Sequence, residues 1–302
     1  DETETFMKDV YEFYKNSNLL QNQEFSDISL LEEITNSINR IKVIKTILKR
    51  DCMKVAFFGR TSNGKSSVIN AILGSPILPS GIGHTTSCFV SMRGCHEREP
   101  YVIAPESPDK RNVNDLRQLA NAVSDTNLGP NNLINVYWPI EKCPILEHQV
   151  SFLDSPGIDV DHDLDTWINQ YCRDADVFVL VVNSESTLNN SEKKFFHEVN
   201  KYISSPNVFI LNNRWDASAH ELEIEAIKAQ HLKRCVDFLS KELKCVSHDE
   251  AIERVHFTSA IEALYNKTKS SPSPNYRFED KPGFEERIAE FAKFEDKLQL
   301  CL

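Results

Sequence analysis

One stretch, from Val55 to Val68, limits what this chain can fold into more than any other. Residues 55–58 form an apolar run that predicts a buried strand. The sequence G-x-x-x-x-G-K-S follows from Gly59 to Ser66, and the apolar spacing of a helix begins at Val68. This is the pattern of a phosphate-binding loop in the strand–loop–helix context that it requires. The stretch therefore predicts a nucleotide-phosphate site in an α/β domain.

Each part of this loop has a predicted role in holding a nucleotide. Backbone N–H groups and the N-terminus of the following helix would surround the phosphates. Lys65 would reach the β- and γ-phosphates, where it serves catalysis as well as binding, and the Ser66 hydroxyl would hold Mg²⁺. The predicted nucleotide-binding residues of the loop are Gly59, Arg60, Thr61, Ser62, Asn63, Gly64, Lys65, Ser66 and Ser67.

A second motif, Asp154-Ser-Pro-Gly157, follows the apolar run 150–153. A D-x-x-G pattern at a strand end places a carboxylate near the metal, directly or through water. It also places a glycine N–H near the γ-phosphate. Asp154 is therefore a predicted metal ligand, and Gly157 a predicted phosphate contact.

A third motif, Asn213-Arg-Trp-Asp216, follows the apolar run 208–211 and matches [NT]-K-x-D with Arg at the Lys position. An ionised Asp216 can accept hydrogen bonds from N1–H and the 2-amino group of guanine. Adenine offers neither donor, so ATP would leave a buried carboxylate unpaired, at a large cost in affinity. GTP and GDP are therefore the predicted substrate and product. Asn213 would brace the loop or meet N7 of the base.

The remaining base contacts are predicted from neighbouring residues. Arg214 and Trp215 have planar groups that could cover the base, and Trp215 could equally be a hydrophobic plug beneath the loop. Ser259 and Ala260 follow the apolar run 255–257 and would present a backbone N–H to the guanine oxygen.

A glycine-rich segment between the first two motifs has the position of a nucleotide-sensing loop. Its Thr86 is the first choice for the residue that caps Mg²⁺ and senses the γ-phosphate, and Thr85 is the second. His84 could orient the attacking water or be an ordinary surface histidine. Ile158 and Asp159 follow Gly157, so no glutamine takes the water-positioning place there.

Strand and helix patterns alternate along most of the chain, which predicts a mainly parallel sheet with right-handed crossovers. The ranges 105–114 and 124–132 are predicted surface loops, and a helix is predicted from Ser218 to about residue 243. Further predicted strands lie at 88–92, 134–138, 150–153, 177–182, 208–211 and 255–257.

The predicted organisation has a P-loop GTPase domain at 51–265 and a linker at 266–283 that is rich in Ser, Pro and Lys. Residues 1–50 and 284–302 carry apolar stripes at helical spacing. We expect the two terminal segments to pack together as a small helical bundle.

Composition excludes several classes of partner. The 45 acidic and 34 basic residues give a net charge of −11, which disfavours nucleic acid and a broad contact with anionic lipid. No apolar run reaches the roughly 18 residues of a membrane span. The eight cysteines show no C-x-x-C pair, which predicts a reducing compartment. The first residue is not Met and the last helical pattern is cut short, so we expect a part of a longer protein.

The motifs FFGRTSNGKSSVINA, LPSGIGHTT, DSPG, NSESTL and NNRWDAS together resemble the GTPase domain of mitofusins, dynamin-superfamily GTPases of the outer mitochondrial membrane. The resemblance covers most of residues 50–265. It implies nucleotide-dependent self-association through the GTPase domain, which tethers and fuses mitochondria from the cytosolic face of that membrane. It also implies a membrane anchor and further helices outside this chain, which itself would be soluble and without direct membrane contact.

The resemblance also guides the assignment of catalytic and interface residues. Dynamins use a glutamine two residues after the first loop glycine, where this chain has Thr61. The resemblance therefore favours His84 and Thr86 as catalytic residues. Glu185 and Arg214 are candidate partners across a pair of GTPase domains, and a local ion pair is the alternative.

Two other functions remain open at this point. The first is a nucleotide-gated tether in which hydrolysis is incidental. The second is a bacterial-type dynamin that acts on lipid directly, although the chain shows no basic or amphipathic membrane face.

Overall fold

The computed structural model describes residues 2–16, 26–49, 52–80, 87–105, 107–116, 132–159, 167–186, 188–203, 206–269 and 277–302. They form two compact units, residues 1–51 and residues 52–302. Each unit is considered by itself.

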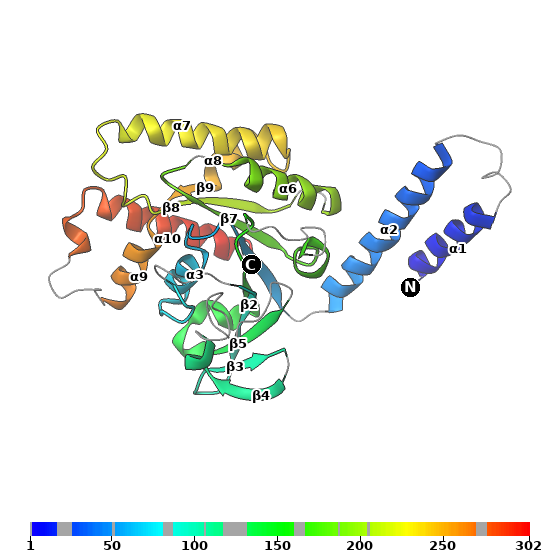
Figure 1. Ribbon diagram of the computed structural model, residues 1–302, viewed down its shortest axis with the longest axis horizontal. Helices are drawn as coiled ribbons and strands as arrows, with labels where there is room; N and C mark the ends of the chain where they lie inside the picture. The colour runs from blue at the N-terminus through cyan, green and yellow to red at the C-terminus, as the bar shows by residue number, and fades with distance from the viewer. Residues whose placement is uncertain are drawn as a thin grey trace. The chain divides into compact units, whose positions relative to one another are not determined.

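The first unit consists of two helices, α1 (Glu2–Asn16) and α2 (Ser26–Lys49), which pack against each other (Figure 1). Glu4 of α1 forms ion pairs with Lys45 of α2 at 2.5 Å and with Lys8 at 2.8 Å. These hydrogen-bonded lysines lower the pKa of Glu4 to about 2. No helix in the part of the chain that the structure describes is long and apolar enough to cross a membrane.

The second unit is built on a nine-stranded sheet in the order β4-β3-β5-β2-β6-β1-β7-β8-β9. Five of the strand pairings are parallel and three, β2–β6, β3–β4 and β3–β5, are antiparallel, which confirms the mainly parallel sheet. The strands are β1 (Met53–Phe58), β2 (Phe89–Cys95), β3 (Tyr101–Ala104), β4 (Ser107–Asn112), β5 (Leu133–Pro139), β6 (Val150–Asp154), β7 (Val177–Asn183), β8 (Val208–Asn213) and β9 (Val255–Phe257).

Helices cover both faces of this sheet, and each face has its own apolar core. One core contains side chains of α3, α9 and α10, and the other contains side chains of α6, α7, α8 and the π-helical turns. The helices are α3 (Lys65–Leu73), α6 (Asn190–Tyr202), α7 (Ile224–Asp237), α8 (His248–Glu253), α9 (Ala260–Thr268) and α10 (Phe284–Leu300). The short turns are η2 (Val113–Asp115), η3 (Ile140–Lys142), η4 (Pro144–His148), η5 (Ile168–Cys172), η6 (Phe238–Glu242) and η7 (Phe278–Asp280).

The C-terminal helix differs from its predicted place in a terminal bundle. The apolar stripe of α10, Phe291, Phe294 and Leu298, is buried in the same core as strands of the sheet. The ring of Phe294 meets that of Phe209 on β8 at a centroid distance of 5.9 Å. An apolar stripe shows that a helix is covered but not by what, and here the sheet covers it. By contrast, Phe6 and Phe13 of α1 are 65% and 67% exposed.

Two other predicted boundaries are corrected. Residues 105–114 were predicted as a loop, yet β4 lies within them as an edge strand, and its polar sequence SPDKRN needs little burial there. The helix predicted from Ser218 begins at Ile224, because residues 218–223 form turns first. The predicted loop at 124–132 lies outside the described residues except for Asn132, and so do residues 270–276 of the predicted linker at 266–283.

The topology brings the predicted motifs to one edge of the sheet. The carboxyl ends of the parallel strands β1, β6, β8 and β9 lie at this edge, where open α/β sheets bind their ligands. Strand β2 runs antiparallel to β6, so its first residues lie against the end of β6, with Val90 paired to Asp154.

Candidate nucleotide-binding site

The phosphate loop leaves β1 after Phe58 and enters α3 at Lys65. Gly59 has φ +152°, and a Cβ there would lie 2.2 Å from the Val181 carbonyl oxygen. Gly64 has φ +93°, and a Cβ there would lie 2.4 Å from Nδ2 of Asn213. Both positions therefore require glycine, since a side chain would be strained and would clash with neighbouring atoms.

Buried amides fix the middle of this loop. Asn63 is 4% exposed, and its Nδ2 donates to the Val181 carbonyl at 2.8 Å and to Glu192 at 3.2 Å. Glu192 also closes a capping box with Asn189 at the start of α6. The sequence analysis missed Glu192, although the spacing Asn189-x-x-Glu192 is a readable capping signal.

The side chain of Lys65 lies inside the phosphate loop. Its Nζ donates to the carbonyl oxygens of Gly59 at 3.0 Å and Arg60 at 3.2 Å, and the residue is 6% exposed. Burial lowers its pKa, while the nearby carboxylates, Asp154 first among them, act to raise it. An ammonium held in this way is a compact positive charge inside an anion cradle.

Asp154 ends β6 and faces the first turn of α3. The Ser66 hydroxyl donates to its Oδ2 at 2.5 Å, whereas its Oδ1 is buried without a hydrogen-bond partner. Burial raises the pKa of Asp154 to about 6, against the opposing effects of Lys65 and Ser66. A buried carboxylate with an unpartnered oxygen beside a hydroxyl is an oxygen donor set that suits Mg²⁺.

The D-x-x-G segment is joined to the phosphate loop through Asp159, which the sequence analysis did not assign. Oδ1 of Asp159 accepts from the Thr61 N–H at 2.7 Å and from the Thr61 hydroxyl at 2.9 Å. Desolvation acts to raise the pKa of Asp159, but the hydrogen bonds from Thr61 outweigh it and lower that pKa. Between them lies Gly157, where an added Cβ would be 2.1 Å from Oγ1 of Thr61.

Asn213 connects the phosphate end of the site to the base end. It is 2% exposed, its Nδ2 donates to the Asn63 carbonyl at 2.9 Å, and its Oδ1 accepts from the Ala260 N–H at 2.9 Å. Of the two predicted roles for Asn213, the structure shows the brace. The Ala260 N–H is consequently directed at Asn213, and the predicted contact of the backbone of residues 259–260 with the guanine oxygen stays a prediction.

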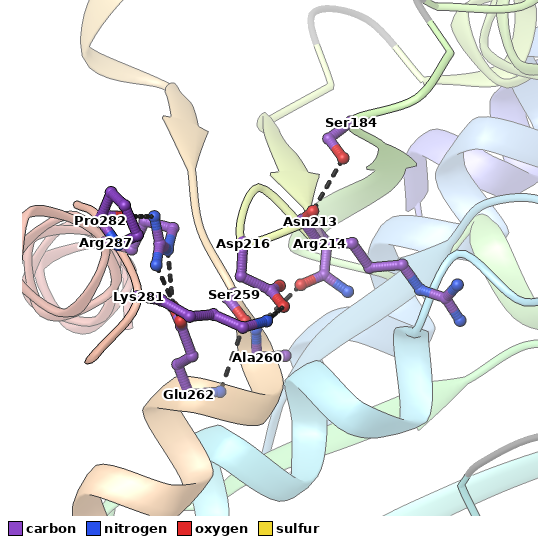
Figure 2. A network of polar contacts seen from close by, with 10 residues as sticks. All are labelled: Ser184, Asn213, Arg214, Asp216, Ser259, Ala260, Glu262, Lys281, Pro282 and Arg287. Atoms are coloured by element: carbon purple, nitrogen blue, oxygen red, sulfur yellow. Dashed lines mark hydrogen bonds and ion pairs between the residues drawn. The ribbon is translucent and has the colours of Figure 1, made fainter. Parts of the chain in front are cut away.

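The turn that follows β8 places the side chains of Arg214 and Trp215 in different environments. Arg214 has φ +62° and an exposed side chain that extends away from Asp216 (Figure 2). Trp215 is 4% exposed and packs edge-on against Phe257, at a centroid distance of 4.7 Å. Of the two roles left open for Trp215, the structure shows the hydrophobic plug, so its predicted contact with the base is corrected.

Asp216 has a charged partner that comes from far along the chain. Its Oδ2 accepts from Nζ of Lys281 at 2.8 Å, and the side chains are 13% and 24% exposed (Figure 2). Desolvation acts to raise the pKa of Asp216, but hydrogen bonds from Lys281 and Ser259 outweigh it and lower that pKa. Lys281 falls in the predicted linker, where no spacing pattern distinguishes it from other lysines.

The two candidate interface residues lie on neighbouring loops. Glu185 follows β7 and Arg214 follows β8, and both are exposed. The loops are joined because the Ser184 hydroxyl donates to the Arg214 carbonyl at 2.8 Å. Both residues are described, and no ion pair within 4.0 Å joins them. Glu185 instead lies near Nδ2 of Asn183, at 3.5 Å.

The predicted nucleotide-sensing loop with His84, Thr85 and Thr86 lies outside the described residues. Its flanks are fixed near the site. Upstream, the Asn70 side chain accepts from the N–H groups of Ile77 and Leu78 at 3.0 and 2.8 Å. Downstream, β2 begins beside the end of β6.

Comparison with known proteins gives one family and a set of relatives. The Dynamin family matches residues 55–214. The chain is 49% identical to transmembrane GTPase Marf of Drosophila melanogaster, over 92% of this chain and 35% of that protein. It is 44% identical to mitofusin-2 of Homo sapiens, over 100% of this chain and 39% of that protein. The chain thus spans well under half of the length of these relatives.

A solved structure of an oligomerised bacterial dynamin pair, described as a mechanism for long-range sensing and tethering of membranes, has the same fold. The TM-score is 0.52 at 17% sequence identity, and the match covers 93% of this chain and 44% of that one.

Proposed function

Because the chain belongs to the dynamin family and carries its GTPase domain, we propose that it binds and hydrolyses GTP and that nucleotide-dependent pairing of its GTPase domains tethers and fuses mitochondrial outer membranes. One observation carries the nucleotide part. Four loops, 59–66, 154–157, 213–216 and 259–260, leave parallel strands at the same edge of the sheet. The first two loops form the phosphate end of the proposed site and the last two form its base end, and the side chain of Asn213 joins the two ends.

At the phosphate end, the chain holds the triphosphate and its metal. The backbone of residues 59–64 and the start of α3 surround the phosphates, and Lys65 exchanges its carbonyl partners for phosphate oxygens. Ser66 and Asp154 are the residues that would hold Mg²⁺. When bound, Mg²⁺ neutralises the charge that develops between the β- and γ-phosphates.

At the base end, Asp216 selects guanine. Its ionised carboxylate accepts from N1–H and the 2-amino group. Trp215 supports this loop from beneath, in the core.

Hydrolysis needs a residue that orients water, and we assign this role to His84 and the metal-capping role to Thr86. The support is that Thr61, at the position of the dynamin glutamine, has its hydroxyl bonded to Asp159. Strand β2, which follows His84 and Thr86 in the chain, begins beside Asp154. A Thr86→Ala variant should retain GDP affinity and lose turnover.

Association is assigned to the face that carries Glu185 and Arg214. Both are exposed on joined loops at the nucleotide edge, without an ion pair to each other, so each is free to meet the opposite charge of a second copy. The partners of the longer protein would be a second GTPase domain, further helices and a membrane anchor outside this chain. Its place would be the cytosolic face of the mitochondrial outer membrane.

Calorimetry on metal-replete protein tests the nucleotide assignment. GDP and GTP should bind, and ATP should bind at least about 100-fold more weakly, because it leaves Asp216 without its base partners. Equal affinity for ATP and GTP, or none for either, would refute the assignment.

Sedimentation tests the pairing. The chain should be monomeric alone and dimeric with GDP plus aluminium fluoride, and Arg214→Glu should abolish the dimer while Arg214→Glu combined with Glu185→Arg restores it. A monomer under every nucleotide would refute the pairing.

A nucleotide-gated tether is the second candidate function, and the Thr61–Asp159 contact favours it because it removes the position that dynamins use in catalysis. In that case a non-hydrolysable GTP analogue alone should give a long-lived dimer. A dimer that appears only with GDP plus aluminium fluoride would exclude this candidate.

A further inference from the structure

Lys281 differs from a typical surface lysine in how its backbone is held. It follows η7, and its N–H donates to the Phe278 carbonyl at 3.1 Å. Phe278 is 2% exposed and packs against Tyr265 of α9, with a centroid distance of 4.8 Å. The residue therefore lies on a turn that is fixed to the sheet unit before it, and not on a free loop.

The chain is equally fixed after Lys281, by a buried arginine. Arg287 of α10 is 4% exposed, and its NH1 donates to the Pro282 carbonyl at 2.7 Å. Its Nε and NH2 form a bidentate pair with Glu262 at 2.6 and 2.8 Å, and Glu262 is fully buried. Bidentate arginine–carboxylate pairs are the strong and directional kind.

These contacts form part of a closed ring of polar contacts that includes Asp216 (Figure 2). Glu262 lies in the first turn of α9, and its N–H donates to the hydroxyl of Ser259, which caps that helix. Ser259 in turn bonds to Asp216, and Lys281 closes the ring from the other side. The charged groups that face Asp216 are thus Lys281, Arg287 and Glu262, contributed by the turn before α10, by α10 and by α9.

Such a ring of contacts can control the ionisation and the orientation of a carboxylate that recognises a base. A carboxylate can accept two donors from guanine only when it is ionised and when both oxygens face the base. Asp216 is largely removed from water, which works against ionisation. A fixed ammonium at 2.8 Å supplies the opposing charge and holds Oδ2 from the side. A carboxylate has about four lone-pair sites, so it can accept from Lys281 and from a base together.

We propose that Lys281 is part of the guanine site, as a positioning residue that keeps the Asp216 carboxylate ionised and aimed at N1–H and the 2-amino group of the base. The inference rests on the proposed guanine-nucleotide function and adds a residue to it. The Arg287–Glu262 pair fixes the turn from which Lys281 reaches Asp216.

The test compares GDP with IDP, whose hypoxanthine keeps N1–H and lacks the 2-amino group. In the wild-type chain, GDP should bind at least about 10-fold more tightly than IDP, the usual effect of one hydrogen bond to a charged group. Lys281→Met should weaken GDP about 10-fold and IDP less, so that the GDP/IDP ratio falls to about 3-fold. Lys281→Arg should restore the ratio.

The matched control is Lys297→Met. Lys297 lies in the last turn of α10 and pairs with Glu253 at 3.0 Å, so this variant removes a comparable ion pair away from Asp216. It should leave both affinities unchanged. If Lys281→Met is too unstable to measure, Lys281→Gln, which keeps a donor without the charge, should show the same direction with a smaller change.

A pH series separates positioning from a purely structural role. The wild-type GDP/IDP affinity ratio should change little between about pH 7.5 and about pH 5.5, because Asp216 stays ionised and titration of Asp154, whose pKa is about 6, acts on both nucleotides alike. In Lys281→Met the pKa of Asp216 should rise, so the GDP/IDP ratio should fall further as the pH falls through this range. Thermal unfolding without nucleotide checks that each variant is folded.

Three results would overturn the inference while leaving the guanine site intact. They are an equal loss for GDP and IDP with no added pH dependence, unchanged affinity in Lys281→Met, and tighter GDP binding, which would mean that Lys281 competes with the base. Absence of GDP binding by the wild-type chain would instead refute the proposed function itself.

Discussion

Two aspartates at the same edge of the sheet, Asp154 and Asp216, have opposite environments. Asp154 has one buried oxygen without a partner, and burial raises its pKa to about 6. Asp216 is bonded to a lysine and a serine, which lower its pKa in spite of desolvation. Both follow parallel strands, yet the first lacks a full set of partners and the second brings its own cation.

The difference between the two aspartates matches the kind of ligand that each would bind. A metal cation would supply the charge that Asp154 needs, and Lys65, whose Nζ is hydrogen-bonded to carbonyl oxygens of the loop, acts on Asp154 only through space. A purine base supplies neutral donors, which cannot keep a buried carboxylate ionised without help. The comparison teaches that the partners of a carboxylate, and not its place on the fold, indicate the charge of its ligand.

The largest expected effect is at the phosphate end. Lys65→Ala should weaken GDP binding at least about 100-fold in calorimetry, because the charge inside the loop is lost. Lys54→Ala is the control, since Lys54 lies on the neighbouring β1 and pairs with Asp174 at 2.7 Å outside the loop. It should leave GDP affinity unchanged. Near-normal binding by Lys65→Ala would show that the base end alone holds the nucleotide.

The next effect tests whether the two ends depend on each other. A Cβ at Gly64 would lie 2.4 Å from Nδ2 of Asn213, so Gly64→Ala should displace that amide from both loops. We expect about 10-fold weaker GDP binding and a lower GDP/IDP affinity ratio, because phosphate and base contacts loosen together. An equal loss for GDP, IDP and inorganic pyrophosphate, with the GDP/IDP ratio unchanged, would show that the effect is limited to the phosphate end and that the two ends are independent.

The contrast between the aspartates should appear as opposite signs in stability. In EDTA, Asp154→Asn should raise the free energy of unfolding by about 1 kcal/mol, because it removes a buried charge with an unpartnered oxygen. Asp216→Asn should lower it by about 1–2 kcal/mol, because it leaves Lys281 without its partner. Denaturant unfolding measures both, with Asp237→Asn, at a partly exposed aspartate that pairs with Lys241, as the reference. A change of the same sign in the free energy of unfolding of both variants would contradict the contrast between Asp154 and Asp216.

The smallest expected effect concerns Trp215. Trp215→Phe should change GDP affinity less than about 3-fold and lower the free energy of unfolding by about 1 kcal/mol, because the ring packs in the core and not on the base. A larger loss of GDP affinity with an unchanged free energy of unfolding would instead indicate that Trp215 contacts the base.

The phosphate end was predictable because its determinants are local. Gly59, Gly64, Lys65 and Ser66 lie within eight consecutive positions, and their spacing alone implies a strand–loop–helix cradle. The D-x-x-G motif predicted that Asp154 would lie at the metal position beside Ser66, and the structure brings it there, whereas the contact of Asn213 with Asn63 of the phosphate loop was not predicted.

The remainder of the site could not be read from spacing. Asp159 and Lys281 meet Thr61 and Asp216 across 98 and 65 positions of sequence, and no periodic pattern marks such pairs. The α10 stripe was found by its period, but its partner was misassigned, because amphipathic spacing does not identify the surface that covers it.

The bridge made by Asn213 has a consequence for how a bound molecule leaves. Its amide satisfies the Asn63 carbonyl on one side and the Ala260 N–H on the other, all three away from water. If either loop opened alone, a polar group would remain stranded in the interior at the opposite side. We therefore expect bound nucleotide to leave by concerted opening of both loops, with one barrier, and not by release from one end at a time.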